Sequence, residues 1–191
     1  MARSPLYHEA IGAYNAGNLV LALQLMEDAA RQGDPVACFE VALWHNGTDG
    51  MPADKVRSKQ WLVRFVQLAE DGDPEAQWEV GQNYRFGNLL PQNTKRANHW
   101  LERSAEGGYG EAQHHLASFL RRGAYGYPVD EDASEMWYRR AFEQDHPETL
   151  YLFALRKFED GRPTDEAIRL LKKAAEKGFH HAECVLASYM H

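Results

Sequence analysis

Small and apolar residues recur along this chain at steps of three and four, which is the spacing of one face of an α-helix. The pattern is clearest between residues 73 and 108, where Ala76, Val80 and Tyr84 share one stripe and a second stripe begins at Ala97. A proline-containing loop separates the two stripes, so this segment predicts a pair of helices. Neither helix can bury its stripe alone, and stacking against neighbouring pairs would supply the core.

Local signals mark where these helices begin and end. Asp73-Pro74 combines a good N-cap with proline at the first helical position, and Gly87 is suited to end that helix. Gly81 removes side-chain bulk, so that a neighbouring helix can approach closely. Equivalent first-helix starts are expected at Asp34-Pro35 and, less well capped, at His146-Pro147. Loops with proline two residues before Asp or Asn predict second-helix caps at Asp54, Asn93, Asp130 and Asp165.

The same unit is written five times. Each copy closes on two small or apolar residues, a gap of two, and Gly or a substitute for it, at positions 33, 72, 108, 145 and 178. Self-similarity at this period is typical of helix-pair solenoids. We therefore expect an all-α protein, an α/α superhelical solenoid of about five helix-turn-helix repeats with a terminal half repeat. The expected organisation is a single domain over 1–191, with units near 5–33, 34–72, 73–108, 109–145, 146–178 and 179–191.

The repeat resembles a known family. Ala76-x-x-x-Val80-Gly81-x-x-Tyr84-x-x-Gly87, followed by Ala97-x-x-Trp100 and Ser104-Ala105-x-x-Gly108, is similar to the Sel-like repeat, a relative of the tetratricopeptide repeat. The resemblance covers nearly the whole chain, with departures at His45, Lys157, Asp145 and Trp61. It implies an α/α superhelix that acts as a scaffold in protein complexes, as in degradation machinery, bacterial signalling and host interaction. A cysteine-rich branch linked to β-lactam binding has paired cysteines in each repeat, which this chain lacks.

Charge and composition narrow the function classes. The net charge is −7, with 28 acidic and 21 basic side chains and no basic stripe, which disfavours nucleic-acid binding. No apolar run approaches the roughly 18 residues that span a bilayer, and the first residues show no secretory apolar region. The two cysteines, Cys38 and Cys184, fall in distant repeats and are expected as buried thiols. We expect a cytoplasmic protein without membrane insertion, and the resemblance to the Sel-like repeat implies a bacterial one.

The candidate binding surface follows from helical geometry. With Asp73 as position one, positions 4, 8 and 12 form the core stripe, and positions 3, 6, 7, 10, 13 and 14 point the opposite way. In tetratricopeptide-type solenoids the matching face lines the concave groove. The residues expected there to bind a partner protein or peptide are Phe39, Glu40, Trp78, Glu79, Gln82, Arg85, His114, Ser118, Arg121, Arg122, Tyr151 and Leu155.

Aromatic and arginine side chains dominate this set, as they do at interface anchors. The aromatic rings would supply apolar area, and the arginines would meet carboxylates bidentately. The alternative interpretation is that the aromatics only pack against the adjacent first helix and that the charges form a solvated face.

No motif for metal binding or catalysis emerges. The adjacent pairs His114-His115 and His180-His181 cannot readily chelate one ion from a helix, because successive residues do not share a face. Phosphate-binding, dinucleotide-binding and nucleophile-elbow motifs are absent from the sequence. We therefore expect no cofactor, no metal and no enzymatic activity.

The function predicted is a protein–protein interaction scaffold or adaptor. Two alternatives stay open: a dedicated inhibitor or immunity protein for one toxin or enzyme, and a small-molecule hydrolase, which would need a deep pocket. The last helix, before Met190-His191, carries Val185, Leu186 and Tyr189, which predicts weak self-association through that helix.

Overall fold

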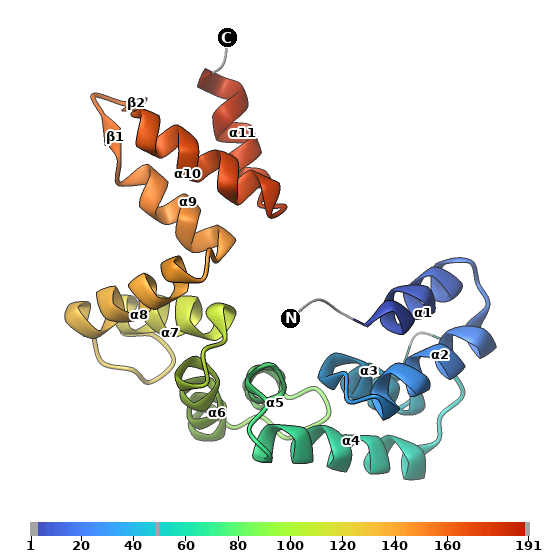
Figure 1. Cartoon of the computed structure of the whole chain (residues 1–191). Helices are drawn as coiled ribbons and strands as arrows, with labels where there is room; N and C mark the ends of the chain where they lie inside the picture. The colour runs from blue at the N-terminus through green and yellow to red at the C-terminus, as the bar shows by residue number, and fades with distance from the viewer. Residues whose placement is uncertain (1–3, 49, 190–191) are drawn as a thin grey trace. The chain divides into compact units, whose positions relative to one another are not determined.

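The computed structural model describes residues 4–48 and 50–189 and is almost entirely helical (Figure 1). It divides into two compact units, Met1–Gly107 and Gly108–His191. Within each unit, consecutive helices pack against one another in chain order. The fold class predicted from the repeats, a solenoid of helix pairs, is confirmed.

The first unit contains three helix pairs. They are α1 (Pro5–Asn15) with α2 (Leu19–Arg31), α3 (Pro35–His45) with α4 (Lys55–Glu70), and α5 (Pro74–Phe86) with α6 (Thr94–Glu106). Two second helices also pack against the first helix of the next pair, α2 against α3 and α4 against α5. This alternation gives the helices from α2 to α5 a packing partner on both sides.

The second unit repeats this arrangement. Its helices are α7 (Gly110–Arg122), α8 (Glu131–Glu143), α9 (Pro147–Leu155), α10 (Asp165–Glu176) and α11 (His180–Tyr189). Between α9 and α10, the two-residue strands β1 (Phe158–Glu159) and β2 (Arg162–Pro163) pair antiparallel. The strands therefore replace the plain loop that joins the helices of the other long pairs.

The helix ends obey the capping signals with one exception. The Asp73 carboxylate accepts the Ala76 N–H at 2.7 Å, and Asp34, Asp54, Asn93 and Asp130 cap their helices in the same way. The prediction that Asp165 caps α10 is wrong, because the Thr164 hydroxyl accepts the Ala167 N–H instead. Asp165 is the first helical residue, where its negative charge interacts favourably with the positive end of the helix dipole.

Small residues set the distance between the helices of a pair. A Cβ built on Gly81 would lie 3.2 Å from the Ala97 carbonyl oxygen and 3.3 Å from the Trp100 Cβ. This close approach confirms the role predicted for Gly81. At the equivalent point of two other pairs, a serine hydroxyl donates a hydrogen bond of 2.8 Å to a carbonyl oxygen of the first helix. These bonds run from Ser58 to Ala42 and from Ser134 to Ala117.

Trp44 and Cys38 are buried, whereas Cys184 is exposed. Trp44 stacks on Tyr14 with ring centroids 5.6 Å apart. Cys38 is buried as predicted, and burial raises the pKa of its thiol to about 11. Cys184 is exposed rather than buried, because it lies on α11, which packs along only one side.

Residues 1–3, residue 49 and the terminal Met190-His191 lie outside the described residues. Among residues 4–48 and 50–189, every helix is too short or too polar to span a lipid bilayer.

Candidate partner-binding groove

Five of the predicted site residues meet in one groove of the second unit. His114, Ser118, Arg121 and Arg122 come from α7, and Tyr151 comes from α9. The groove has a volume of about 290 Å³ and is open to solvent. Its remaining lining residues are Tyr138, Glu148, Leu152 and Phe179. Because α7 and α9 are the first helices of successive repeats, the predicted face does form a continuous surface here.

The base of this groove is aromatic. The Tyr151 ring lies 5.2 Å from the Phe179 ring between centroids, and the His114 ring lies 5.4 Å from that of Tyr138. Tyr151 and His114 are each half-buried, so part of each ring is held by packing and part faces the groove. Rings held in this way offer apolar contact area at little further entropy cost.

Charges of opposite sign border the groove. Arg121 and Arg122 are exposed at the end of α7, and the Arg122 guanidinium donates 2.8 Å to the Ser118 hydroxyl. Glu148 lines the groove from the first turn of α9. A ligand that carries a carboxylate near the arginines would therefore find complementary charge, as would a cation near Glu148.

A buried polar network underlies this surface. The Thr149 side chain is fully buried, and its hydroxyl lies 2.8 Å from His114 Nδ1 and 3.1 Å from His146 Nδ1. The opposite nitrogens face carboxylates, with His146 Nε2 2.8 Å from Glu111 and His114 Nε2 3.2 Å from Glu148. The two imidazole rings stack with centroids 4.9 Å apart.

Counting hydrogens constrains the charge of this network. A hydroxyl has one hydrogen, so Thr149 can donate to at most one of the two Nδ1 atoms and must accept from at least one. If both Nε2 atoms also donate to their carboxylates, at least one of the two rings carries hydrogens on both nitrogens. All four contacts are therefore made together only when His114 or His146 is an imidazolium.

The histidines lower the pKa values of the two glutamates beside them. Hydrogen bonds from His115 and His146 hold the pKa of Glu111 well below its usual range, against the opposing effect of burial. The bond from His114 lowers the pKa of Glu148. Both glutamates thus stay ionised, and the network couples the first turn of α7 to the first turn of α9.

The predicted residues of the first unit are placed differently. Phe39 and Trp78 are buried, with 9% and 7% of their surface exposed, and Arg85 is buried as well. Phe39 packs against Phe65 of α4 with ring centroids 5.5 Å apart. The expectation that Phe39 and Trp78 offer accessible apolar area is therefore wrong. Phe39 is held by packing, but its partner is the second helix of its own pair and not the adjacent first helix of the alternative interpretation.

The remaining predicted residues are accessible but are not brought into the α7–α9 groove. Glu40, Glu79 and Gln82 are half-buried on α3 and α5, and Leu155 is exposed at the end of α9. The predicted set of binding residues also left out some lining residues. Glu148 and Leu152 occupy positions three and seven of their first helix, so they lie on the predicted face and the periodicity indicates both. Tyr138 and Phe179 lie outside the first helices and gave no such signal.

In the described residues, no group of three or more His, Cys, Asp or Glu side chains is arranged to hold a metal ion. The histidines of the second unit are instead bonded to Thr149, Glu111 and Glu148.

Comparison with known proteins identifies the repeat. The Sel1 repeat model matches residues 7–34, 35–67, 74–109, 110–146 and 162–179. A Sel1 repeat protein from Oxalobacter formigenes superposes with a TM-score of 0.66 at 27% identity, over 95% of this chain and 53% of that one. No curated protein has a significantly similar sequence.

Two further structures were compared. The protein c5321, a protective antigen of uropathogenic Escherichia coli with an SLR fold, gives a TM-score of 0.58 at 25% identity, over 96% of this chain and 40% of that one. The immunity protein Pa5087 from Pseudomonas aeruginosa gives 0.43 at 13% identity, over 98% and 83%, a likeness too distant to bear on activity. This chain thus spans about half or less of the length of the two more similar structures.

Proposed function

This chain belongs to the Sel1 repeat family, and we propose that it is a non-enzymatic scaffold that binds a segment of a partner protein in the α7–α9 groove. Sel1 repeat proteins generally mediate protein–protein interactions and are generally non-catalytic. The observation that carries the proposal is the convergence of residues from two first helices on one groove with an aromatic base and charged borders.

The groove suggests which chemistry the partner presents. Tyr151, Leu152 and Phe179 would receive an apolar side chain, and Arg121 with Arg122 would bind a carboxylate next to it. Glu148 would favour a lysine or arginine on the other side. A partner segment with acidic, apolar and basic residues in series fits this order of surfaces.

The contacts of the polar groups favour binding over catalysis. A serine nucleophile needs an adjacent base, but the Ser118 hydroxyl is held by the Arg122 guanidinium. His114, one helical turn before Ser118 on α7, has Nδ1 on Thr149 and Nε2 on Glu148. We therefore place the hydrolase alternative below the scaffold. The exposed thiol of Cys184 fits a reducing compartment, and we propose a cytoplasmic location.

The experiment is affinity purification from the native host, followed by titration calorimetry with the partner identified. We expect the double variant Arg121→Gln/Arg122→Gln and the single variant Tyr151→Ala each to weaken binding at least about tenfold, as loss of an interface anchor does. Arg169→Gln, an exposed arginine on α10, is the matched control and should bind like the wild type.

Melting temperatures measured in parallel separate lost binding from lost folding. Unchanged affinity in both groove variants, with the fold intact, would refute the proposed site. One stoichiometric, nearly irreversible partner would favour the inhibitor or immunity alternative, whereas several weaker partners would support an adaptor.

A further inference from the structure

A second charged surface lies in the first unit, on helices that the sequence did not single out. Arg57, Trp61 and Arg64 of α4 face Glu27 and Arg31 of α2 across a hollow of about 500 Å³. Both are second helices of their pairs, so this surface is separate from the first-helix face considered above. Three of its lining side chains are cationic and one is anionic, in a chain whose net charge is −7.

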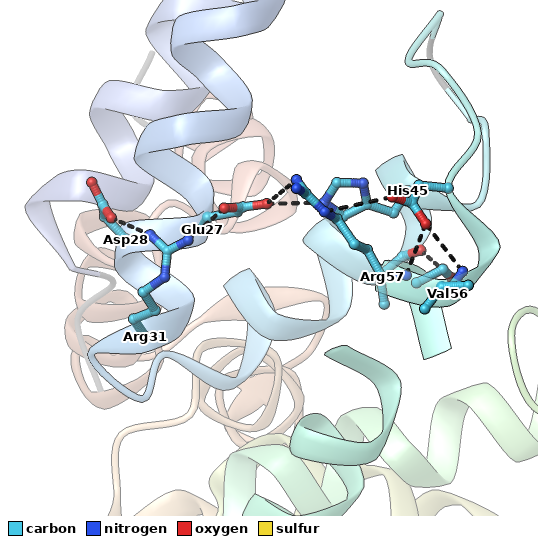
Figure 2. A network of polar contacts seen from close by, with 9 residues as sticks. Glu27, Asp28, Arg31, His45, Val56 and Arg57 are labelled. Carbon is cyan, nitrogen blue, oxygen red and sulfur yellow. Dashed lines mark hydrogen bonds and ion pairs between the residues drawn. The ribbon is translucent and has the colours of Figure 1, made fainter. Parts of the chain in front are cut away.

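The internal ion pairs leave the three arginines in unequal situations. Figure 2 shows Glu27 at the centre of the network, contacted by Arg31 at 2.6 Å and by His45 Nε2 at 2.9 Å. Arg31 also binds Asp28, with Nη1 2.5 Å from Oδ1. The charge of Arg31 is therefore balanced by two carboxylates within the protein.

Arg57 and Arg64 are held less tightly. The Arg57 guanidinium lies 3.5 Å from Asp54 and 4.0 Å from Glu27, and 60% of its side chain is exposed. Asp54 is already engaged, because its Oδ1 accepts the backbone N–H groups of Val56 and Arg57, and these bonds lower its pKa. Arg64 donates to the main-chain carbonyl of Arg31 at 2.9 Å, and its guanidinium lies 5.8 Å from the Trp61 ring. Both guanidinium groups keep donors for an external anion.

An apolar cleft continues from this hollow. It has a volume of about 400 Å³ and shares Glu27, Arg31 and Arg57 with the arginine surface. Its apolar walls come from Leu19, Val20, Leu23, Met51 and Pro52. Val20 is 81% exposed, so the cleft presents aliphatic area directly to solvent.

We propose that this α2–α4 surface binds an acidic segment of a partner protein, with an aliphatic side chain in the cleft and carboxylates on Arg57 and Arg64. The two arginines are seven residues apart on one helix, so their Cα atoms are separated by about 10 Å along the axis. Two acidic residues of one peptide can span that distance, whereas one phosphate ion cannot. The adjoining aliphatic cleft favours a peptide over a nucleic acid.

The test uses a synthetic peptide with a central leucine and two glutamates on each side, alternating with serine, so that either chain direction places carboxylates over the arginines. Binding to the full chain is followed by NMR of backbone amides and of the Trp61 indole N–H. We expect shifts confined to α2 and α4. Replacing all glutamates with glutamine, or the leucine with serine, should weaken binding at least about tenfold, because charge-assisted bonds and apolar burial each supply that much.

Protein variants locate the site. Arg57→Gln and Arg64→Gln should each weaken peptide binding about five- to tenfold, and Lys59→Gln, on the same helix but outside the hollow, should change it less than twofold. The Arg57→Gln variant is expected to fold like the wild type, because the substitution removes only long ion pairs and leaves the hydrogen bond from Arg64 to the main chain in place.

Several results would overturn the proposal. They are equal weakening by Lys59→Gln, shifts in the α7–α9 groove instead of α2 and α4, unchanged binding of the glutamine peptide, or full displacement of the peptide by a single-stranded oligonucleotide. The variant Arg121→Gln/Arg122→Gln should leave peptide binding unchanged. The two surfaces can therefore succeed or fail independently.

Discussion

Removal of the Thr149 hydroxyl is the sharpest test of the buried network beneath the α7–α9 groove. Thr149→Val keeps the side-chain shape but takes away the one group that contacts both His114 Nδ1 and His146 Nδ1. The side chain of His146 is only 6% exposed and that of His114 only 13%, so water cannot readily replace the lost partner. The substitution thus leaves two imidazole nitrogens facing a methyl group.

The expected cost follows from these contacts. Leaving a buried nitrogen unsatisfied costs about 1–3 kcal/mol, and losing the second, less buried contact costs about 1 kcal/mol. The new methyl group returns about 0.8 kcal/mol of apolar burial. We therefore expect Thr149→Val to destabilise the protein by about 2 kcal/mol, or by roughly 4–8 °C in melting temperature for a chain of 191 residues.

The control is Thr149→Ser, which keeps the hydroxyl and loses one methyl group, at a cost of about 1 kcal/mol. Urea and thermal unfolding of the full chain measure both variants, and NMR of the imidazole nitrogens reports whether the rings keep their hydrogens. In the wild type, at least one of the two rings should show hydrogens on both nitrogens when all four contacts are made. A valine variant as stable as the wild type, with unchanged imidazole signals, would refute the proposed hydrogen count.

Three further predictions concern packing, backbone strain and pH. Gly81→Ala should destabilise the α5–α6 pair by about 1–3 kcal/mol in urea unfolding, because the new Cβ meets the α6 backbone. Gly12→Ala is the control, since Gly12 has open space around it, and this substitution should stabilise the protein by up to about 1 kcal/mol. Equal effects of the two substitutions would contradict the packing argument. Asp145 has a φ of 58°, in the left-handed region that glycine adopts with less strain. Asp145→Gly should therefore raise the free energy of unfolding by about 0.5–1 kcal/mol, even though the exposed ion pair with Lys173 is lost. A lower melting temperature would show that the ion pair outweighs the strain. The folded-state pKa of Glu111 is depressed, so its contribution to folding stability is present above the unfolded value near 4.5 and is lost as the pH falls below that value. Glu111→Gln should lower the melting temperature at pH 6 and make it depend less on pH between about pH 5 and 3. A variant whose melting temperature keeps the wild-type dependence on pH would argue against this contribution.

The sequence by itself determined the repeat, the helix boundaries and the class of fold. These features depend on contacts a few residues apart, such as the Asp73 cap or the turn at Gly87, whose φ is 75°. They also depend on the period of small residues, which records where helices meet in every repeat. Gly81 could be assigned to a close helix approach for this reason. The position of the accessible face on α7 and α9 followed from the same periodicity.

Tertiary structure decided which side chains on that face stay accessible. Phe39 occupies a position equivalent to His114, yet it packs on Phe65, whereas His114 lines the groove. Helical geometry gives both residues the same direction, and only the size of the neighbouring side chains tells them apart. The contact between Thr149 and His114 joins residues 35 apart in the chain. The α2–α4 surface likewise depends on Arg57 and Arg31 meeting across two helices. Such contacts are fixed by how repeats stack, which a local pattern does not encode.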